Sequence, residues 1–224
     1  MRGKHMELVF LPTIFFVSSF ILHLVSRQDF VLLRKNISVS WIFDSAVAAF
    51  VIALFFSRFL YVLNNQDLSL FHVFKFFHLI KFPGLSILGF FLGGAFALYI
   101  IYRKSNALAR IYDIFTISFM QLYVFDTVVR AFSIGPFYVS LIFLVLFIFI
   151  FLFFIRSHYR YTLKDGTMSL AFLLLVAITA FIFQFFDPGR HIVIPPFSIA
   201  QIISVFLIFS TLILIFINQK LLKF

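Results

Sequence analysis

Five ionisable side chains interrupt stretches of this 224-residue chain that are otherwise apolar, and they are its first candidates for chemistry. They are Asp44, Arg58, Asp113, Asp126 and Arg130. A charged side chain within a transmembrane helix costs roughly 2.5 to 3.5 kcal/mol, so each one needs a partner or a purpose. Asp44 and Asp113 stand near the beginnings of apolar runs. A carboxylate there complements free backbone donors and the helix dipole, which favours a structural role for both.

Arg58 stands near the end of its apolar run, beside Tyr61 and Asn64. A guanidinium group binds phosphate oxygens through a planar fork, and a lipid phosphodiester is the commonest such group at that depth. The alternative is that Arg58 only extends its charge to the lipid headgroups. Asp126 and Arg130 are four residues apart with the acid first, the favourable order for an ion pair within a helix. That pair is either structural or functional.

The composition is that of a membrane protein. Hydrophobic residues make up 63% and charged residues 12% of the chain, with a mean hydropathy of +1.13, which leaves too little polar surface for a soluble catalytic domain. Apolar runs long enough to cross a bilayer recur at residues 8–26, 41–63, 84–102, 107–133, 136–155, 168–186 and 197–218. These runs are continuous and lack the alternation of a barrel strand, so each one predicts a helix.

The predicted fold is therefore an all-α membrane bundle of about seven transmembrane helices. We expect residues 1–224 to form a single transmembrane domain. Residues 1–7 are interpreted as a short outer segment or a cloning remnant that does not contribute to the fold.

The distribution of basic residues predicts the orientation. If the N-terminus is outside, eleven of the 18 lysines and arginines fall on inner segments: Arg27, Arg34, Lys35, Arg103, Lys104, Arg110, Arg156, Arg160, Lys164, Lys220 and Lys223. Five fall on outer segments: Arg2, Lys4, Lys75, Lys81 and Arg190. Arg58 and Arg130 are the remaining two, within the membrane. Because basic residues favour the inner face, the count predicts an outer N-terminus and a cytoplasmic C-terminus.

Residues 70–82 are predicted to form an amphipathic helix in the plane of the membrane. His72, Lys75, His78 and Lys81 recur at three-residue steps among phenylalanines. The basic edge would meet anionic headgroups while the phenylalanines enter the acyl region. The two histidines are six residues apart, whereas a helical pair of metal ligands needs three or four, so no metal site is expected.

Small residues predict a close approach between two of the helices. Ser45, Ala49, Ala53 and Ser57 recur every four residues on one run, and Gly89, Gly93 and Ala97 do so on the next. Such stripes let helix backbones approach closely. This contact would hold Arg58 rigidly over the beginning of the second helix.

Other classes of function are excluded or disfavoured. The chain has no cysteine, so it forms no disulfide and offers no thiolate ligand or nucleophile of its own. The net charge of +10 is explained by loop residues that meet anionic lipids, and neither a separate basic domain nor a stacking platform for nucleic acid is visible. No motif of a soluble enzyme is present, and no cofactor is expected.

Several segments, in order along residues 8–216, resemble the bacterial prolipoprotein diacylglyceryl transferases. FSRFLYVLNN at residues 56–65 is similar to that family's arginine–tyrosine stretch, and PGLSILGFFLGG at 83–94 to its glycine-rich loop and helix. YRKSNALARIYD ends at Asp113, the position of a family aspartate. FDTVVRAFSIG at 125–135 resembles the signature-arginine segment, and FIFQFFDP and FSIAQIIS resemble the closing motifs. The seven predicted spans agree with the topology of that family.

The resemblance implies roles for individual residues. Arg130 and Arg58 would hold and neutralise a phosphodiester. Leu88 occupies the position of the family histidine, which leaves His78 or His72 as the nearby candidate base. Gln184 stands where the family has a glutamate. The implied substrate-binding residues are Tyr61, Asn64, Ser86, Gly89, Asp126, Gln184 and Gln201.

The implied activity moves a diacylglyceryl group from phosphatidylglycerol to the lipobox cysteine of a prolipoprotein in the bacterial inner membrane. Its partners would be phosphatidylglycerol, the prolipoprotein signal peptide and membrane lipids. Two alternatives stay open. One is a catalytically silent relative that binds lipid or a partner protein. The other is an anion or small-solute transporter, which would need a polar path to the inner face, where we count Asp44 and Asp113 as the only acids.

Overall fold

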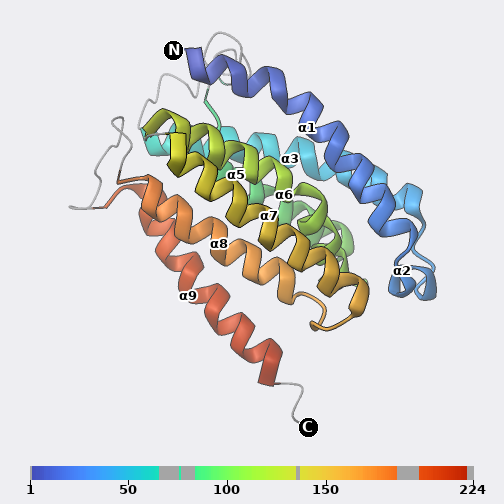
Figure 1. The fold of residues 1–224 in the computed structure, drawn as a ribbon. Helices are drawn as coiled ribbons and strands as arrows, with labels where there is room; N and C mark the ends of the chain where they lie inside the picture. The colour runs from blue at the N-terminus through green and yellow to red at the C-terminus, as the bar shows by residue number, and fades with distance from the viewer. Residues whose placement is uncertain (1, 66–75, 77–83, 135–136, 186–196, 221–224) are drawn as a thin grey trace. The chain divides into compact units, whose positions relative to one another are not determined.

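The described part of the computed structural model is built from helices (Figure 1). It describes residues 2–65, 76, 84–134, 137–185 and 197–220, and the side chains of 13–64, 76, 84–128, 144–185 and 197–218. The helices are α1 (Arg2–Arg27), α2 (Phe30–Arg34), α3 (Val39–Asn65), α5 (Ile87–Tyr102), α6 (Leu108–Ile134), α7 (Phe137–Arg160), α8 (Thr167–Phe183) and α9 (Ile199–Lys220). The all-α prediction is confirmed.

Each predicted apolar run contains a helix, but the helices differ in length. In the described part of the chain, three helical stretches are long and apolar enough to cross a membrane: Val39–Asn64, Leu108–Val128 and Ile199–Asn218. Shorter apolar helices cover Thr13–Arg27, Ile87–Tyr102 and Thr167–Phe183. These helices support a membrane protein, because an apolar segment of that length is stable as a helix in lipid.

Two expectations about the N-terminal region differ from the structure. α1 begins at Arg2, so residues 2–7, which are not expected to contribute to the fold, are helical. The segment between the apolar runs 8–26 and 41–63, for which no helix is predicted, contains the short helix α2. Asp29 caps this helix, since its Oδ1 accepts a hydrogen bond from the backbone N–H of Leu32 at 3.0 Å.

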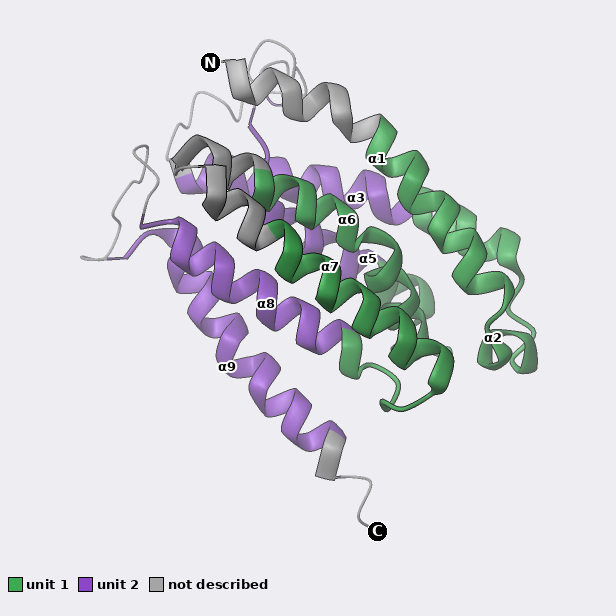
Figure 2. Ribbon diagram, viewed as in Figure 1, with its two compact units in different colours: residues 1–47, 98–168 green, residues 48–97, 169–224 purple. Residues whose placement is uncertain are grey.

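The chain divides into two compact units (Figure 2). Unit 1 comprises residues 1–47 and 98–168, and unit 2 comprises residues 48–97 and 169–224. Each unit is thus built from two separate stretches of sequence. The prediction of a single domain over residues 1–224 stays a prediction.

In unit 1, α1 and α7 both pack on α6. The core is aromatic and aliphatic: the rings of Phe15 and Phe119 join α1 to α6 at 6.2 Å between centroids, and those of Tyr123 and Phe147 join α6 to α7 at 5.2 Å. Met120 of α6 is fully buried. α6 therefore makes the principal core contacts of this unit, and several polar residues on it are buried, among them Arg110, Asp113 and Ser118.

In unit 2, α3 and α5 approach each other through glycine. A Cβ atom added to Gly89 would lie 2.6 Å from the carbonyl oxygen of Phe56, and one added to Gly93 would lie 2.5 Å from the Cβ of Phe56. Only the absence of a side chain permits this spacing. The predicted close contact of these two helices is confirmed. The rings of Phe91 and Phe172, 5.0 Å apart, join α5 to α8.

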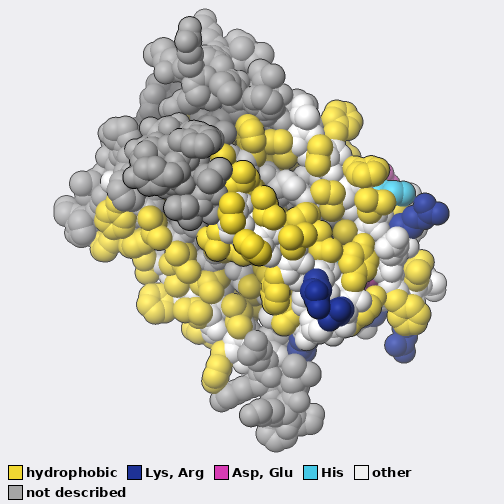
Figure 3. Space-filling model, viewed as in Figure 1, with side chains coloured by type: hydrophobic (Ala, Val, Ile, Leu, Met, Phe, Trp, Pro, Cys, Tyr) yellow, Lys and Arg dark blue, Asp and Glu magenta, His cyan; other side chains and the backbone are white. Residues whose placement is uncertain are grey.

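Hydrophobic side chains cover much of the described surface seen in Figure 3. Many are large and exposed, as in the middle of α7 and along α9, where Phe149 and Phe206 are examples. A water-soluble protein rarely exposes contiguous apolar patches of this extent, whereas lipid chains cover them without penalty.

Candidate functional site

The structure positions Arg58 at the end of α3 by bonds to neutral backbone groups. Its guanidinium is buried, with Nε donating to the carbonyl oxygen of Phe76 at 3.2 Å and Nη1 to that of Gly84 at 2.9 Å. The ring of Tyr61, one turn further along α3, lies 5.4 Å from the guanidinium carbon. Carbonyl oxygens and an aromatic face hold a cation in place without adding a formal negative charge.

The connection that precedes α5 is fitted tightly to α3. Gly84 has a φ of +149°, and a Cβ there would lie 2.1 Å from Cζ of Tyr61, so only glycine allows the ring to cover this backbone. The N–H of Ser86 donates to the carbonyl of Ser57 at 3.1 Å, and the Ser57 hydroxyl donates to the carbonyl of Ser86 at 2.9 Å. These bonds fix the backbone that carries the Arg58 acceptor.

The beginning of α9 is attached to the same end of α3. The backbone N–H of Ala200 donates to Asn64 Oδ1 at 3.3 Å. Ser198 and Gln201 form a reciprocal cap: the Ser198 N–H donates to Gln201 Oε1 at 3.0 Å, and the Gln201 N–H donates to Ser198 Oγ at 3.3 Å. Gln201 Nε2 is buried without a hydrogen-bond partner among the described residues. A buried donor of this kind is costly unless a ligand satisfies it.

The structure thus brings together at one end of unit 2 most of the residues that the resemblance implied for substrate binding. Arg58, Tyr61, Asn64, Ser86, Gly89 and Gln201 belong to this end by the contacts above. Gln184 follows the last turn of α8, and the rings of Phe181 and Phe197, 6.3 Å apart, join that region to the beginning of α9.

The remaining predicted site residues are not brought to this end by any described contact. Asp126 is half-buried on α6 of unit 1, and Arg130 lies on the same helix with a side chain outside the described residues. His78 and the predicted interfacial helix at 70–82 lie outside the described residues, except for Phe76. Phe76 was expected to enter the acyl region. Instead it is buried beside Val62 and 5.5 Å from the ring of Phe55, because Arg58 holds its backbone carbonyl.

A buried ionic cluster that the sequence did not suggest lies in unit 1. Arg110, in the first turn of α6, donates through Nε and Nη2 to Asp29 Oδ2, each at 2.7 Å. Both side chains are at most 1% exposed. Nη1 lies 3.3 Å from Asp165 Oδ1, and the guanidinium carbon lies 4.7 Å from the ring centroid of Tyr161. The carboxylates offset the unfavourable position of a cation at a helix N-terminus.

His158 of α7 completes this cluster. Its Nε2 lies 3.3 Å from Asp29 Oδ2 and 3.2 Å from Nη2 of Arg110, while its Nδ1 is buried without a hydrogen-bond partner in the described part of the chain. Tyr161 has a φ of 52°, a left-handed conformation that is rare outside glycine, and its stacking against Arg110 helps to maintain it. The cluster therefore ties α2, α6, α7 and the α7–α8 connection together.

Asp113 has a structural role in the same region. It is buried in the second turn of α6, and its Oδ2 accepts a hydrogen bond from the backbone N–H of Gly166 at 2.7 Å. The expected structural role is confirmed, but the donor belongs to the α7–α8 connection and not to the first turn of α6. Asp44, by contrast, is exposed in the second turn of α3.

The Asp29 carboxyl group is strongly acidic. Burial raises its pKa, but hydrogen bonds from His158, Arg110 and the backbone of Leu32 outweigh burial and lower the pKa from 3.8 to about 2. These partners favour the carboxylate over the neutral acid.

This shift predicts a loss of stability in acid. A depressed folded-state pKa stabilises the protein above the ordinary pKa, so the contribution of about 2 kcal/mol is complete above pH 4 and is lost as the pH falls from about 4 toward 2. Thermal unfolding of the purified protein between pH 2 and 6 measures it. Asp29→Asn should remove this part of the pH dependence, and an unchanged profile in that variant would contradict the assignment.

Sequence reasoning missed this cluster because its members are far apart in the chain. The charge count places Arg110 among the basic residues of the inner segments, and only Asp44 and Asp113 are named there as inner acids. Asp29 and Asp165 also fall on segments assigned to that side, so that statement was wrong. The sequence does contain one signal for this cluster. Asp29 and Asp165 are each the single acid of a connection whose other charged residues are basic.

Comparison with known proteins identifies no similar protein. No protein-family model matches the chain, and neither the curated proteins nor the solved structures searched contain a match.

Proposed function

We propose that this protein is an enzyme of the bacterial inner membrane that transfers a diacylglyceryl group from phosphatidylglycerol to the lipobox cysteine of a prolipoprotein. In this proposal the chain crosses the membrane seven times, with the N-terminus outside and the C-terminus in the cytoplasm. The substrate-supplied thiol agrees with the absence of cysteine from the chain. The collinear motifs described above are the sequence support for this proposal.

The observation that carries the proposal is the setting of Arg58. The guanidinium is fixed by the carbonyls of Phe76 and Gly84, so it does not have to be ordered when a substrate arrives. A preorganised cation stabilises negative charge as it develops on a leaving phosphate. The buried Nε2 of Gln201, on α9, is a further donor at the same end of unit 2.

In the proposed reaction, the substrate thiolate forms a C–S bond with the glyceryl carbon as the C–O bond to phosphate breaks. Glycerol phosphate leaves with the electron pair of that bond, and a base takes the thiol proton. Arg58 and Arg130 neutralise the leaving phosphate in this scheme, and His78 is the candidate base. Tyr61, Asn64, Ser86 and Gln201 would shape the lipid site.

One specific observation favours a silent lipid-binding relative as the second candidate. Leu88, at the position that the resemblance assigns to a histidine, is buried on α5 and carries no group able to move a proton. Such a relative would bind the same lipid at Arg58 without catalysing transfer.

Purified protein, labelled phosphatidylglycerol and a lipobox peptide test the proposal directly. We expect thioether-linked diacylglycerol on the peptide together with an equal amount of released glycerol phosphate. A peptide with serine in place of the cysteine is the matched control and should acquire no lipid. Bound phosphatidylglycerol without glycerol phosphate release would reject the enzyme and support the silent relative. No binding at all would reject both.

A further inference from the structure

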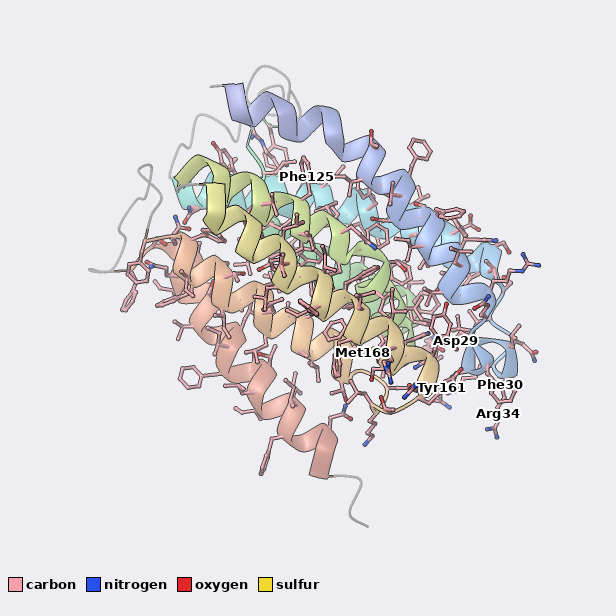
Figure 4. All side chains as sticks on the ribbon, in the orientation of Figure 1. Asp29, Phe30, Arg34, Phe125, Tyr161 and Met168 are labelled. Carbon is pink, nitrogen blue, oxygen red and sulfur yellow. The ribbon has the colours of Figure 1, made fainter. Side chains whose placement is uncertain are left out.

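The short helix α2 exposes two large apolar side chains. Leu32 is buried, whereas Phe30 is 65% and Leu33 is 59% exposed. Arg34 and Lys35 follow directly and are also exposed. Figure 4 shows Phe30 and Arg34 at the outer edge of α2, with Asp29 on the side nearer Tyr161. The helix therefore presents an apolar pair beside a basic pair.

This helix is held in place by bonds from both of its ends. Asp29 caps its N-terminus through Oδ1 while Oδ2 is bound by the buried Arg110 of α6. At the other end, Asn36 has a φ of 53°, the N–H of Ile37 donates to the carbonyl of Leu32 at 3.1 Å, and Lys35 Nζ donates to the carbonyl of Asn106 at 2.6 Å. A five-residue helix is not stable alone, so these contacts keep α2 helical. They thereby hold its apolar side chains in exposed positions.

The position of α2 in the chain places it at a membrane surface. It lies between the end of α1 at Arg27 and the beginning of α3 at Val39, and the described α3 stretch is able to cross a bilayer. A segment that directly precedes a helix able to cross the bilayer lies at the headgroup level. Trp41, in the first turn of α3, is 52% exposed, and tryptophan is enriched at that level.

The charge at this position is positive. Arg27 and Arg34 are exposed together with Lys35, while the only acid of the connection, Asp29, is buried and bound by Arg110. A basic surface next to exposed phenylalanine and leucine complements an anionic leaflet, in which the apolar side chains enter the acyl boundary and the cations meet phosphates.

We infer that α2 is a rigid membrane-surface wedge that inserts Phe30 and Leu33 into the boundary between headgroups and acyl chains of an anionic leaflet. Arg34 and Lys35 then lie at the level of the lipid phosphates. This surface belongs wholly to unit 1 and does not rest on the proposed transferase activity. It applies to whichever membrane face holds the connection between α1 and α3.

A tryptophan depth measurement tests the insertion. The chain has one tryptophan, so Trp41→Phe combined with Phe30→Trp gives a single probe on α2. In vesicles of phosphatidylglycerol and phosphatidylcholine, we expect this probe to be quenched most by lipids brominated near the headgroup. Trp41→Phe with Phe149→Trp, in the middle of α7, is the matched control and should be quenched most by bromines near the chain ends.

Two outcomes of this measurement would overturn the proposal. Quenching of the α2 probe by aqueous iodide and by no brominated lipid would place α2 in water. Protection from both quenchers would mean that protein, such as a second copy of this chain, covers Phe30.

Energy transfer from the same probe to labelled lipids tests the preference for anionic headgroups. We expect labelled phosphatidylglycerol to be enriched over labelled phosphatidylcholine around α2, and Arg34→Gln to reduce that enrichment by about fivefold, the effect of one cation at an anionic surface. Arg156→Gln removes the same charge from α7 and should leave the ratio unchanged. Equal transfer to both lipids in the parent protein would refute an anionic partner.

Discussion

Replacing Arg58 with alanine is expected to lower diacylglyceryl transfer by about 10²- to 10³-fold, the effect of removing one preorganised donor to a developing anion. The residue is buried and fixed by the carbonyls of Phe76 and Gly84, so alanine removes a positive charge held at one defined place. The measurement is the rate of thioether formation with labelled phosphatidylglycerol. Binding of that lipid, measured separately, should weaken in the same variant.

The lysine variant separates charge from geometry. Arg58→Lys keeps the cation but loses the planar fork that reaches both carbonyls, so we expect intermediate activity. Arg103→Ala is the matched control, because Arg103 is exposed on the connection after α5 and should affect neither binding nor transfer. Unfolding temperatures of all three variants show whether each one folds. A folded Arg58→Ala variant that transfers lipid within threefold of the parent would reject the role of Arg58.

The second large effect is on stability. Arg110→Met should destabilise the protein by about 3 to 5 kcal/mol, the usual cost of breaking a buried ion pair by removing one partner. The Asp29 carboxylate would then remain buried without its principal cation. Denaturant unfolding of purified protein in detergent measures this loss. Arg34→Met, which removes an exposed arginine on α2, should change the unfolding free energy by less than about 0.5 kcal/mol.

A double variant shows whether the loss comes from the unpaired carboxylate. Adding Asp29→Asn to Arg110→Met removes the buried charge, so the double variant should be more stable than Arg110→Met alone. If the two single losses simply add, the side chains are not energetically coupled and the cluster does not hold α2 in place.

The sequence by itself determined the class of fold and the positions of the long helices. Continuous apolar runs have one stable solution in lipid, because every backbone group must be satisfied within its own segment. The spacing of Gly89 and Gly93 also determined that α3 and α5 approach closely. Two glycines four residues apart leave one face of a helix without side chains, and a neighbouring helix backbone can pack there.

Only the tertiary structure decided which polar groups meet. Asp29 and Arg110 are 81 residues apart, and Arg110 and His158 are 48 apart, so no helical period connects them. Their contact depends on how α6 and α7 pack, which is set by summed side-chain contacts and not by any local pattern. The same holds for Phe76. Its sequence pattern predicts a lipid-facing side chain, but in the structure its carbonyl oxygen accepts a hydrogen bond from Arg58 and the residue is buried. Local periodicity predicts which face of a segment is apolar. The partner of a buried charge depends instead on how distant segments pack together.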